Sequence, residues 1–591
     1  MRRAFDRPRA YLGFASTIHD PALAIVDEQG QVVFAEATER ALQAKQAWNA
    51  VPDDLARIGS LVERWCADAD TLVTATSWSD RSLGMAPLIR SALRAQARWQ
   101  RVTAWRYRDD ARRFAAQLSA ALMRQGMYRT ALPGSAGLVN LEYRLFESSR
   151  GRRTLERRAF DHHLTHAANG CFTSPFSEAL CAVVDGLGER GSTAFYHFAD
   201  GDLRRLDRPR LFDMSSLGLL YSWICWACGF DPLAGEEWKV MGLAAYGSVT
   251  PEYHDLLQPM LRVDGLSLRK SRDFDARSAR LLGWRERFRT PREAADLAAT
   301  GQHVFGNVMR ELLTNLHATG LSDNVVLSGG CALNSLWNGS AVRDTPFRNL
   351  HVPSAPGDDG NAIGAAMLAW RADHPGAPLP DNGTPYLGSS LSDDTLERLR
   401  RFSGLKVTRL APSDVARTAA GLLAAGKLLG WAQGRAEFGP RALGNRSVLA
   451  DPRSLDVKER LNALVKLREE FRPFAPVVLH EHGADYFEDY SVSRYMERTL
   501  RIREERRGEI PGVVHEDGTG RLQTVRAEWN PRFHALVDDF RSRTGVPVLL
   551  NTSFNVMGRP IIHTVEDAVA MLCTTGLDAM VLDDLLVEKV G

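Results

Sequence analysis

A set of three short apolar runs occurs twice in the first half of this 591-residue chain, and the repeat narrows the possible folds. The first set spans 11–16, 22–28 and 31–38 (YLGFAS, ALAIVDE, QVVFAEAT), and the second spans 179–186, 192–198 and 202–207 (ALCAVVDG, STAFYHF, DLRRLD). Apolar runs of this length, separated by turns that contain Gly, Asp and Pro, are typical of β-strands. The repeat therefore predicts an α/β fold in which one three-strand unit is duplicated.

Doubling of this kind is typical of two-lobed nucleotide-binding α/β proteins of the actin and sugar-kinase type. The segment RADHPGAPLPDNGTPYL, at 371–387, is rich in Pro, Gly and Asp and predicts an interdomain linker. We therefore expect two domains, 1–375 and 376–591. An Arg-rich stretch at 85–130 predicts a helical insertion in the first domain. A solvated insertion is favoured over a nucleic-acid surface, because acidic residues elsewhere balance its charge.

The composition excludes some classes of protein. The net charge is +2 with 25% charged residues, which weighs against a nucleic-acid partner. We expect no membrane span, because no run of about 18 apolar residues occurs, and the first residues lack the apolar run of a secretion signal. Seven cysteines are an odd and sparse number that fits a cytoplasmic protein. The CxxC pair Cys225 and Cys228 has apolar flanks, which favours a buried helix face over a redox or metal site.

The stretch FDHHLTHAANG, at 160–170, contains three histidines. On a helix, the i,i+4 spacing of His162 and His166 places both imidazoles on one face, where they can hold one metal ion. His163 would point elsewhere and act structurally. Two histidines are an incomplete site. Asp358, in the glycine-bounded turn GDDG at 357–360, is a candidate third ligand, although such a turn can simply cap the helix that follows it.

Two further strand-to-glycine turns suit the binding of a nucleotide phosphate. VVDGLGERGS, at 183–192, carries Asp185 and Gly186, and VVLSGGCALN, at 325–334, carries Gly329, Gly330 and Asn334. Each turn alone is weak evidence for a phosphate-binding site, and the two turns together are stronger evidence. Lys239, in GEEWKVMGLAAYG, is one of the few lysines and is either a ligand-binding residue or part of a salt bridge at a helix start.

The second half of the chain carries a basic motif set that predicts an anion pocket. Four Arg, three Gly and two Pro occur in GRAEFGPRALGNRSVLADPR at 434–453, and the guanidinium of Arg can bind two oxygens of a phosphate or carboxylate at once. Asn551 and Ser553, at the end of an apolar run, suit hydrogen bonds to a small planar group such as a urea or a carbamoyl group. A solvated basic face is the alternative. The candidate residues are Arg441, Lys466, Arg472, Arg521, Asn551 and Ser553.

Together these motifs resemble those of the O-carbamoyltransferases of antibiotic and nodulation-factor biosynthesis, over nearly the whole chain from 11 to 589. The resemblance rests on HHLTHA, EEWKVMGLAAYG, LSGGCALN, GDDGNAIGAA, GRAEFGPRALGNRS, KLREEFRPFAP and LLNTSFN. It implies an N-terminal ASKHA domain, similar to Kae1/TsaD, followed by a YrdC-like α/β domain. It also implies two reactions: carbamoyl phosphate and ATP give carbamoyl-adenylate, and the carbamoyl group then passes to a hydroxyl of a small-molecule acceptor.

The resemblance also implies roles for individual residues. His162, His166 and Asp358 would bind a metal, typically Fe²⁺, and His19 would be the general base, as a neutral imidazole with a pKa of about 6.5. Lys466 and Arg472 would act in adenylate formation with ATP and Mg²⁺, in a pocket with Arg441, Arg521, Asn551 and Ser553. The implied nucleotide-binding residues of the first domain are Asp185, Gly186, Lys239, Gly329, Gly330, Asn334 and Asp359.

Two other functions compete with this prediction. A tRNA threonylcarbamoyl-modifying enzyme would share both kinds of domain, but the balanced charge argues against tRNA. An ATP-dependent binding protein of the ASKHA type, similar to a chaperone, would not need the second basic pocket. The sequence identifies neither the acceptor nor the oligomeric state.

Overall fold

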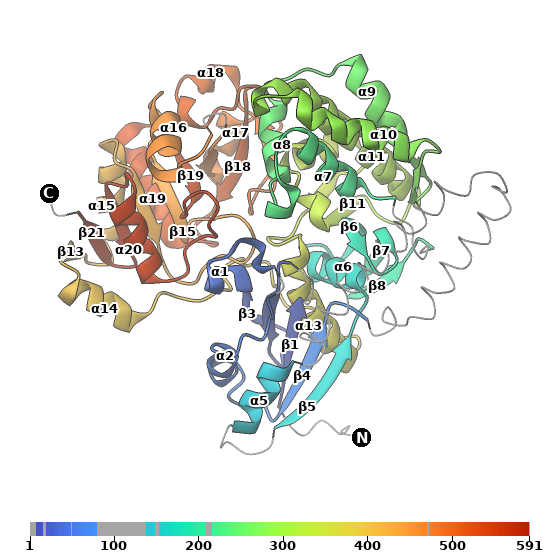
Figure 1. Cartoon of the computed structure of the whole chain (residues 1–591). Coiled ribbons are helices and arrows are strands. Elements are labelled where there is room, and N and C mark those ends of the chain that lie inside the picture. The colour runs from blue at the N-terminus through green and yellow to red at the C-terminus, as the bar shows by residue number, and fades with distance from the viewer. Residues whose placement is uncertain are drawn as a thin grey trace.

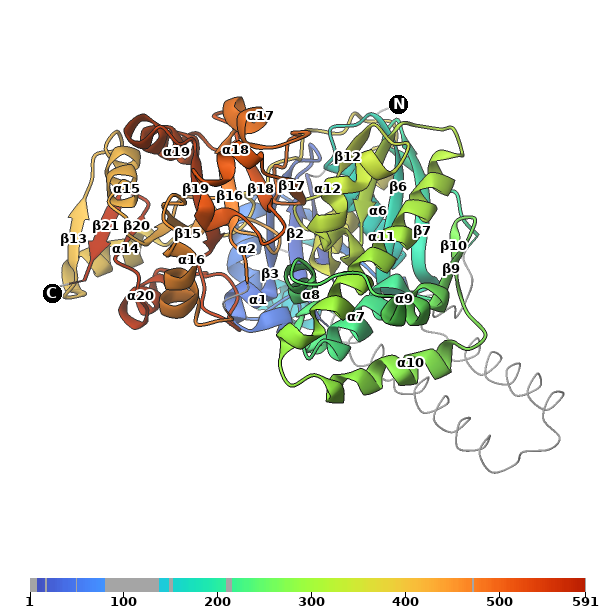
Figure 2. The same ribbon diagram turned by 90° about the horizontal axis from the view of Figure 1, so that it is seen from above.

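The computed structural model describes residues 8–15, 19–48, 50–79, 138–147, 153–208, 215–469 and 472–589. The insertion expected at 85–130 lies outside these residues. Figure 1 shows three sheet-centred regions that meet in the middle of the molecule, and Figure 2 shows the same arrangement from above. The expected α/β class is confirmed, since the sheets alternate with helices along the chain.

The first sheet has the strand order β3-β2-β1-β4-β5. Its strands are β1 (Arg9–Ala15), β2 (Ala22–Val26), β3 (Val32–Ala37), β4 (Thr71–Thr76) and β5 (Thr154–Ala159). β1, β2 and β3 form an antiparallel meander, and β4 and β5 extend the sheet in parallel with β1. The helices α1 (Thr38–Leu42), α2 (Ile58–Trp65) and α5 (Val139–Glu147) accompany this sheet.

The second sheet repeats this arrangement strand for strand. Its strands are β6 (Glu178–Gly188), β7 (Gly191–Ala199), β8 (Asp202–Arg205), β11 (Asn324–Ser328) and β12 (Asn349–His351). β6, β7 and β8 form the antiparallel meander, and β11 and β12 run parallel to β6, which gives the order β12-β11-β6-β7-β8. The six strands predicted from the repeated apolar runs are therefore all present. The first and second sheets therefore have the same topology.

Two helices, α6 (His162–Phe172) and α13 (Asn361–Asp373), pack against each other between the two sheets. α13 covers β1, β2 and β4, and α6 covers β6 and β11. Small residues allow this close packing: a Cβ added at Gly364 of α13 would overlap the carbonyl oxygen of Thr165 on α6. The N-terminus of α6 therefore has a fixed position relative to the turn that precedes α13.

The remaining elements of this half surround the second sheet. They are α7 (Leu217–Ala227), η3 (Pro232–Ala234), α8 (Glu237–Ala244), α9 (Pro251–Leu257), β9 (Leu261–Asp264), β10 (Ser267–Lys270), α10 (Phe274–Gly283), α11 (Ala295–His317), η7 (Gly330–Leu333) and α12 (Ser335–Asp344). Cys225 lies on α7 and Cys228 is its C-cap; both are free and fully buried, so the predicted buried helix face is confirmed.

All nine strands of the third sheet come from the chain after residue 405, in the order β13-β21-β20-β14-β15-β19-β16-β18-β17. They are β13 (Lys406–Arg409), β14 (Leu429–Ala432), β15 (Arg446–Ala450), β16 (Ala475–Leu479), β17 (Arg498–Arg501), β18 (Thr519–Val525), β19 (Val548–Ser553), β20 (Ala579–Leu582) and β21 (Leu585–Glu588). Its main helices are α14 (Asp393–Phe402), α15 (Val415–Ala424), α19 (Pro531–Thr544) and α20 (Val565–Thr574).

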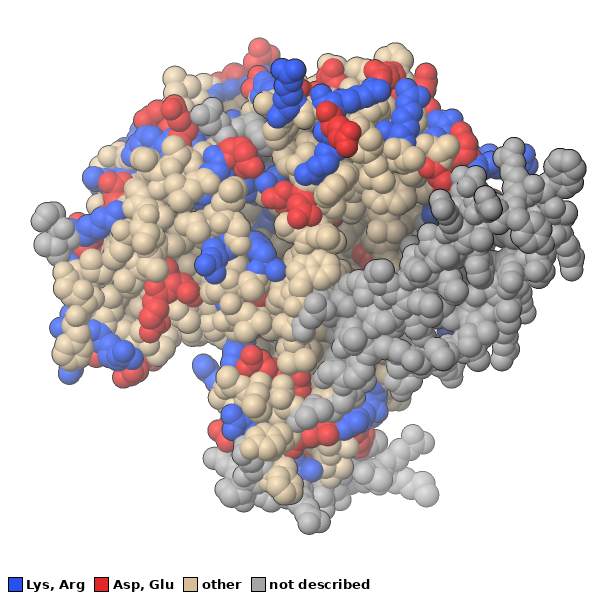
Figure 3. Space-filling model, in the orientation of Figure 1, with Lys and Arg blue, Asp and Glu red and all other residues tan. Residues whose placement is uncertain are grey.

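The third sheet docks on the second-sheet region through α12 and β17. Gly339 of α12 lies against Thr499 of β17 so closely that a Cβ there would overlap the Thr499 carbonyl oxygen. On the face drawn in Figure 3, acidic and basic side chains are interspersed. Among the described residues, no helix is both long enough and apolar enough to cross a membrane.

Candidate active site

Helix α6 begins at the histidine cluster because Asp161 caps it. The Asp161 carboxylate accepts hydrogen bonds from the backbone N–H groups of His163 and Leu164. His162 and His166 then lie one turn apart with their ring centroids 4.7 Å apart, and both are fully buried. The predicted shared helix face is therefore confirmed. Trp78, which follows β4, stacks on the His162 ring at 4.6 Å.

Two carboxylates face this histidine pair. Asp185, at the end region of β6, places Oδ2 3.3 Å from Nε2 of His162 and 3.9 Å from Nε2 of His166. Asp358, in η8 (Asp358–Gly360), places Oδ1 3.5 Å and 3.2 Å from the same two nitrogens. Burial raises the pKa of both carboxyls, but the neighbouring histidines outweigh it and lower both pKa values.

The four side chains fit a transition-metal ion. One ligand atom from each lies within 4.8 Å of all the others, so small side-chain movements would bring all four within about 2.0–2.2 Å of one metal ion. Imidazole suits iron and zinc, whereas sites for Mg²⁺ consist mainly of oxygen. Asp185, which the sequence suggested as a nucleotide-binding residue, thus joins the candidate ligands.

We expect purified protein to contain about one first-row transition metal per chain. His166→Ala and Asp185→Asn should both lower this content strongly, because each removes one of four ligands. His254→Ala, on the partly exposed helix α9, is the matched control and should keep the metal. Full metal content in both ligand variants, measured by elemental analysis, would disprove the assignment.

His163 has a structural position, as its place on the helix predicted. It is buried, and Gly188 of β6 leaves room for it: a Cβ at Gly188 would be 2.5 Å from the imidazole ring. Burial, and then the charge of His162, lower the pKa of His163 well below its usual value. His163 is thus a neutral packing residue.

His19 lies at the edge of this cluster. Its Nδ1 donates to Asp20 Oδ2 at 2.9 Å, and its Nε2 is 3.9 Å from Asp358 Oδ2. Burial lowers the pKa of His19, but the hydrogen bond to Asp20 and the charges of Asp358, Asp20 and Asp185 raise it to about 9. The expected pKa of about 6.5 is therefore wrong for the protein without a bound cation. A cation held by Asp185 and Asp358 would cancel part of this effect.

The two glycine turns meet beside the metal cluster. Gly330 N–H donates to Asp185 Oδ1 at 2.8 Å, so the turn after β11 is joined to the end of β6. Gly329 has φ +88°, and a Cβ there would be 2.5 Å from the Val184 carbonyl oxygen, so only glycine fits. Burial, and then the charges of Asp20 and Glu39, raise the pKa of Asp359 to about 8.

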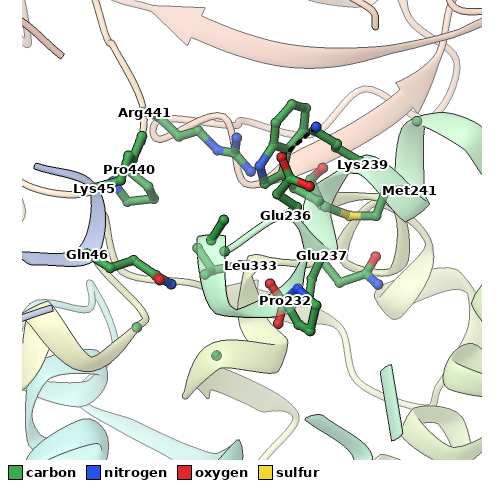
Figure 4. A pocket seen from close by; sticks show the side chains of 18 of the residues that line it. Lys45, Gln46, Pro232, Glu236, Glu237, Lys239, Met241, Leu333, Pro440 and Arg441 are labelled. Atoms are coloured by element: carbon green, nitrogen blue, oxygen red, sulfur yellow. Dashed lines mark ion pairs between the residues drawn. The ribbon is translucent and has the colours of Figure 1, made fainter. Parts of the chain in front are cut away.

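One cavity of about 1010 Å³ brings together candidate residues from both halves of the chain. Figure 4 shows residues of both halves around it, with Arg441 and Lys239 approaching one end. Four predicted residues do not line this cavity: His162, His166, Gly329 and Asn551. The two histidines contact Asp185 and Asp358, which do line it. The predicted residues in the lining are His19, Asp185, Gly186, Lys239, Gly330, Asn334, Asp358, Asp359, Arg441, Lys466, Arg472, Arg521 and Ser553.

Lys466 ends a π-helical turn, η9 (Leu461–Lys466), and its ammonium is surrounded by oxygen atoms. Nζ donates to the carbonyl and Oγ of Ser553 at 2.6 and 3.2 Å, and to the carbonyl and Oδ1 of Asn555 at 3.0 and 2.6 Å. Burial, and then the charges of Arg468 and Arg472, lower the pKa of Lys466. An arriving anion would offset this and favour the charged form.

Several guanidinium groups line the same cavity as Lys466. Burial lowers the pKa of Arg441 to about 10 and that of Arg468 to about 9, and it lowers that of Arg521 well below its usual value. These side chains are close enough to repel one another, since Arg441 and Arg468 both contribute to the lowered pKa of Arg521. A multiply charged anion would stabilise buried cations that repel one another.

Lys239 and Arg472 join the two halves of the chain. Lys239 of α8 pairs with Glu236 at 2.6 Å and with Glu469 of the second half at 3.0 Å. Arg472 pairs with Glu469 at 3.0 Å, and its guanidinium lies 4.0 Å from the ring of Trp238. The salt bridge that the sequence left open for Lys239 is therefore present, and it faces the cavity.

Arg468 and Asn555 line the cavity although the set of pocket residues implied by the resemblance left them out, and that set included Asn551, which does not line it. Asn551 is fully buried in β19, where its Nδ2 donates to Gln523 Oε1 at 2.7 Å and to the Ala442 carbonyl at 3.2 Å. It therefore supports the loop that carries Arg441. Arg468 and Asn555 each follow a predicted pocket residue, Lys466 and Ser553, by two positions.

The fold and the site together define a two-part α/β protein in which a basic anion pocket and a histidine–aspartate cluster share one cavity. The family models for the carbamoyltransferase N-terminus and C-terminus match residues 106–367 and 420–589. The chain belongs to the carbamoyltransferase family.

Named relatives agree with this. Nodulation protein NolO of Bradyrhizobium diazoefficiens is 35% identical over 73% of this chain and 79% of its own length. Nodulation protein U of Azorhizobium caulinodans is 32% identical over 71% of this chain and 75% of its own. Among solved structures, component A of the Acidaminococcus fermentans (R)-2-hydroxyglutaryl-CoA dehydratase is 10% identical, with a TM-score of 0.34 over 62% of this chain and 99% of its own.

Proposed function

We propose that this transferase makes carbamoyl-adenylate from carbamoyl phosphate and ATP, and transfers the carbamoyl group to a hydroxyl of a small-molecule acceptor. The observation that carries the proposal is the shared cavity: a cluster of buried cations forms one wall, and His19 with Asp185 and Asp358 forms another. Phosphate-rich substrates match the first wall, and a proton-accepting step at a hydroxyl matches the second.

The first reaction would take place at the basic wall. Water releases phosphate from carbamoyl phosphate and leaves carbamate. A carbamate oxygen then attacks the α-phosphorus of ATP, and pyrophosphate leaves. Arg441, Arg468 and Arg521 would hold the negative oxygens of both substrates, with Lys466 beside the reacting groups.

The second reaction would take place beside His19. The acceptor hydroxyl attacks the carbamoyl carbon, its proton passes to the His19 imidazole, and AMP leaves. Asp20 holds Nδ1, which leaves Nε2 to accept that proton. The nucleotide of the intermediate provides binding energy that positions the carbon. A divalent metal held by the two histidines and two aspartates would stabilise charge on the nucleotide phosphate.

We further propose the fold and domain assignments that fit this division. The duplicated sheets, with identical strand order, support a first domain (1–375) of the actin and sugar-kinase type. The third sheet, formed entirely from later residues, supports a separate YrdC-like adenylate-forming domain (376–591). The cavity would then lie between the two domains.

Lys466→Arg should lower pyrophosphate release from carbamoyl phosphate and ATP by about 10²-fold, although the charge is kept. Four oxygen atoms from residues 553 and 555 hold the compact ammonium, and a planar guanidinium cannot fit the same positions. Lys406→Arg, on the surface strand β13, is the matched control. Release near the wild-type rate in Lys466→Arg would contradict the role of Lys466.

A further inference from the structure

Two short turns from opposite sides of the first domain meet beside His19. The first is η1 (Lys45–Ala47), followed by Trp48, and the second is η3 (Pro232–Ala234). Trp48 Nε1 lies 3.0 Å from both the Leu233 carbonyl oxygen and Gln46 Oε1, so it joins the turns. Gly235 packs on Gln46: a Cβ there would be 2.7 Å from Gln46 Nε2. We call Trp48 and Leu233, with the two turns, the cavity lip.

The lip presents large apolar side chains to solvent. Leu233 is 67% exposed and Trp48 is 38% exposed, and both line the cavity. The centroid of the Trp48 ring is 5.2 Å from that of His19. Single exposed apolar residues are common, but a joined pair at a cavity entrance is typical of a binding surface. A ligand on the lip would therefore reach the candidate base directly.

Carboxylates lie beside the lip, in contrast to the cations of the basic wall. Asp20 and Glu237 line the cavity near His19, and Glu237 accepts a hydrogen bond from Ser222 Oγ at 2.8 Å. Figure 4 shows Gln46, Pro232 and Glu237 at one end of the cavity, and Lys45 beside Pro440 and Arg441. The side chain of Lys45 thus lies toward the basic wall, although its backbone belongs to η1. Carboxylates at the lip disfavour an anionic ligand.

We propose that the lip binds the acceptor, and that the acceptor is a non-anionic alcohol whose hydroxyl is carried on an apolar ring system. This inference rests on the proposed function and narrows the chemical class of the acceptor. The ring would pack on Trp48 and Leu233, and the hydroxyl would point toward His19. A free sugar would place hydroxyl groups against the aliphatic side chain of Leu233, which costs binding energy when those groups lose water.

Equilibrium dialysis of the full chain tests the chemistry of the lip without requiring turnover. The probes are 2-naphthalenemethanol, its 6-carboxylate and glucose. We expect the neutral aromatic alcohol to bind at least about tenfold more tightly than either of the others. Trp48→Ala and Leu233→Ser should each weaken its binding by about tenfold. Phe402→Ala, on α14 and 78% exposed outside the cavity, is the control and should bind as the wild type does.

Any one of three results would overturn the inference. They are no binding of the aromatic alcohol, equal or tighter binding of the carboxylate or glucose, and unchanged binding in both lip variants. Leu233 is mostly exposed, so Leu233→Ser keeps the test valid even if Trp48→Ala fails to fold. Pyrophosphate release, measured in parallel without acceptor, tests the proposed function separately. Its absence would refute adenylate formation and would leave the binding order as an independent result.

Discussion

His19→Ala should reduce carbamoylated product by about 10²–10⁴-fold, while pyrophosphate release from ATP and carbamoyl phosphate continues. His19 lies beside Asp358 and Asp20, on the wall with the histidine–aspartate cluster, and has no role in holding the anion pocket. The base is needed only when the acceptor hydroxyl attacks. Pyrophosphate and carbamoylated product should be measured separately on the same preparation.

Arg472→Ala should give the converse result. It should lose adenylate formation, because Arg472 lies in the basic wall and holds Glu469 in place. It should still transfer the carbamoyl group from carbamoyl-adenylate supplied ready-made. Arg400→Ala, an exposed residue of α14 that pairs with Glu397, is the matched control and should behave as wild type in both assays.

The shared cavity allows a different outcome for His19→Ala and Arg472→Ala. Because both walls face one space of about 1010 Å³, a single reaction centre could use residues from both. In that case both variants would fail in both assays. That outcome would refute the division into two steps at two places and leave the family membership standing.

The sequence predicted features that depend on local periodicity. Alternating and continuous apolar runs identified the six strands of the repeat, since side-chain burial in a strand follows directly from position. The i,i+4 spacing of His162 and His166 identified one helix face for the same reason.

Features that depend on packing between distant segments could not be predicted. Asp185 follows a strand and precedes glycine, a pattern that also fits a phosphate turn; only the packing of α6 on β6 places its carboxylate at the histidines. Asn551 was placed in the pocket because it ends an apolar run, but its side chain is enclosed by Gln523 of β18 and the Ala442 carbonyl, to which it donates hydrogen bonds. The pKa of His19 depends on Asp358, which is far away in the sequence.

Gly364→Ala should destabilise the protein by about 1–3 kcal/mol, because the added methyl overlaps the Thr165 carbonyl oxygen where α13 crosses α6. The helices must move apart to accept it. Thr165 precedes the candidate ligand His166, and α13 directly follows the turn that holds Asp358. We therefore expect a lower melting temperature together with a reduced metal content per chain.

Gly421→Ala is the matched control, since it makes the same substitution inside helix α15. A Cβ there meets only Arg543 atoms, at an ordinary distance of 3.8 Å. Without a clash, alanine should stabilise the helix by about 0.5–1 kcal/mol, because glycine loses more backbone entropy on folding. The two variants should therefore shift the melting temperature in opposite directions, and only Gly364→Ala should lose metal. An unchanged melting temperature and full metal content in Gly364→Ala would show that the spacing of α6 and α13 does not hold the metal ligands together.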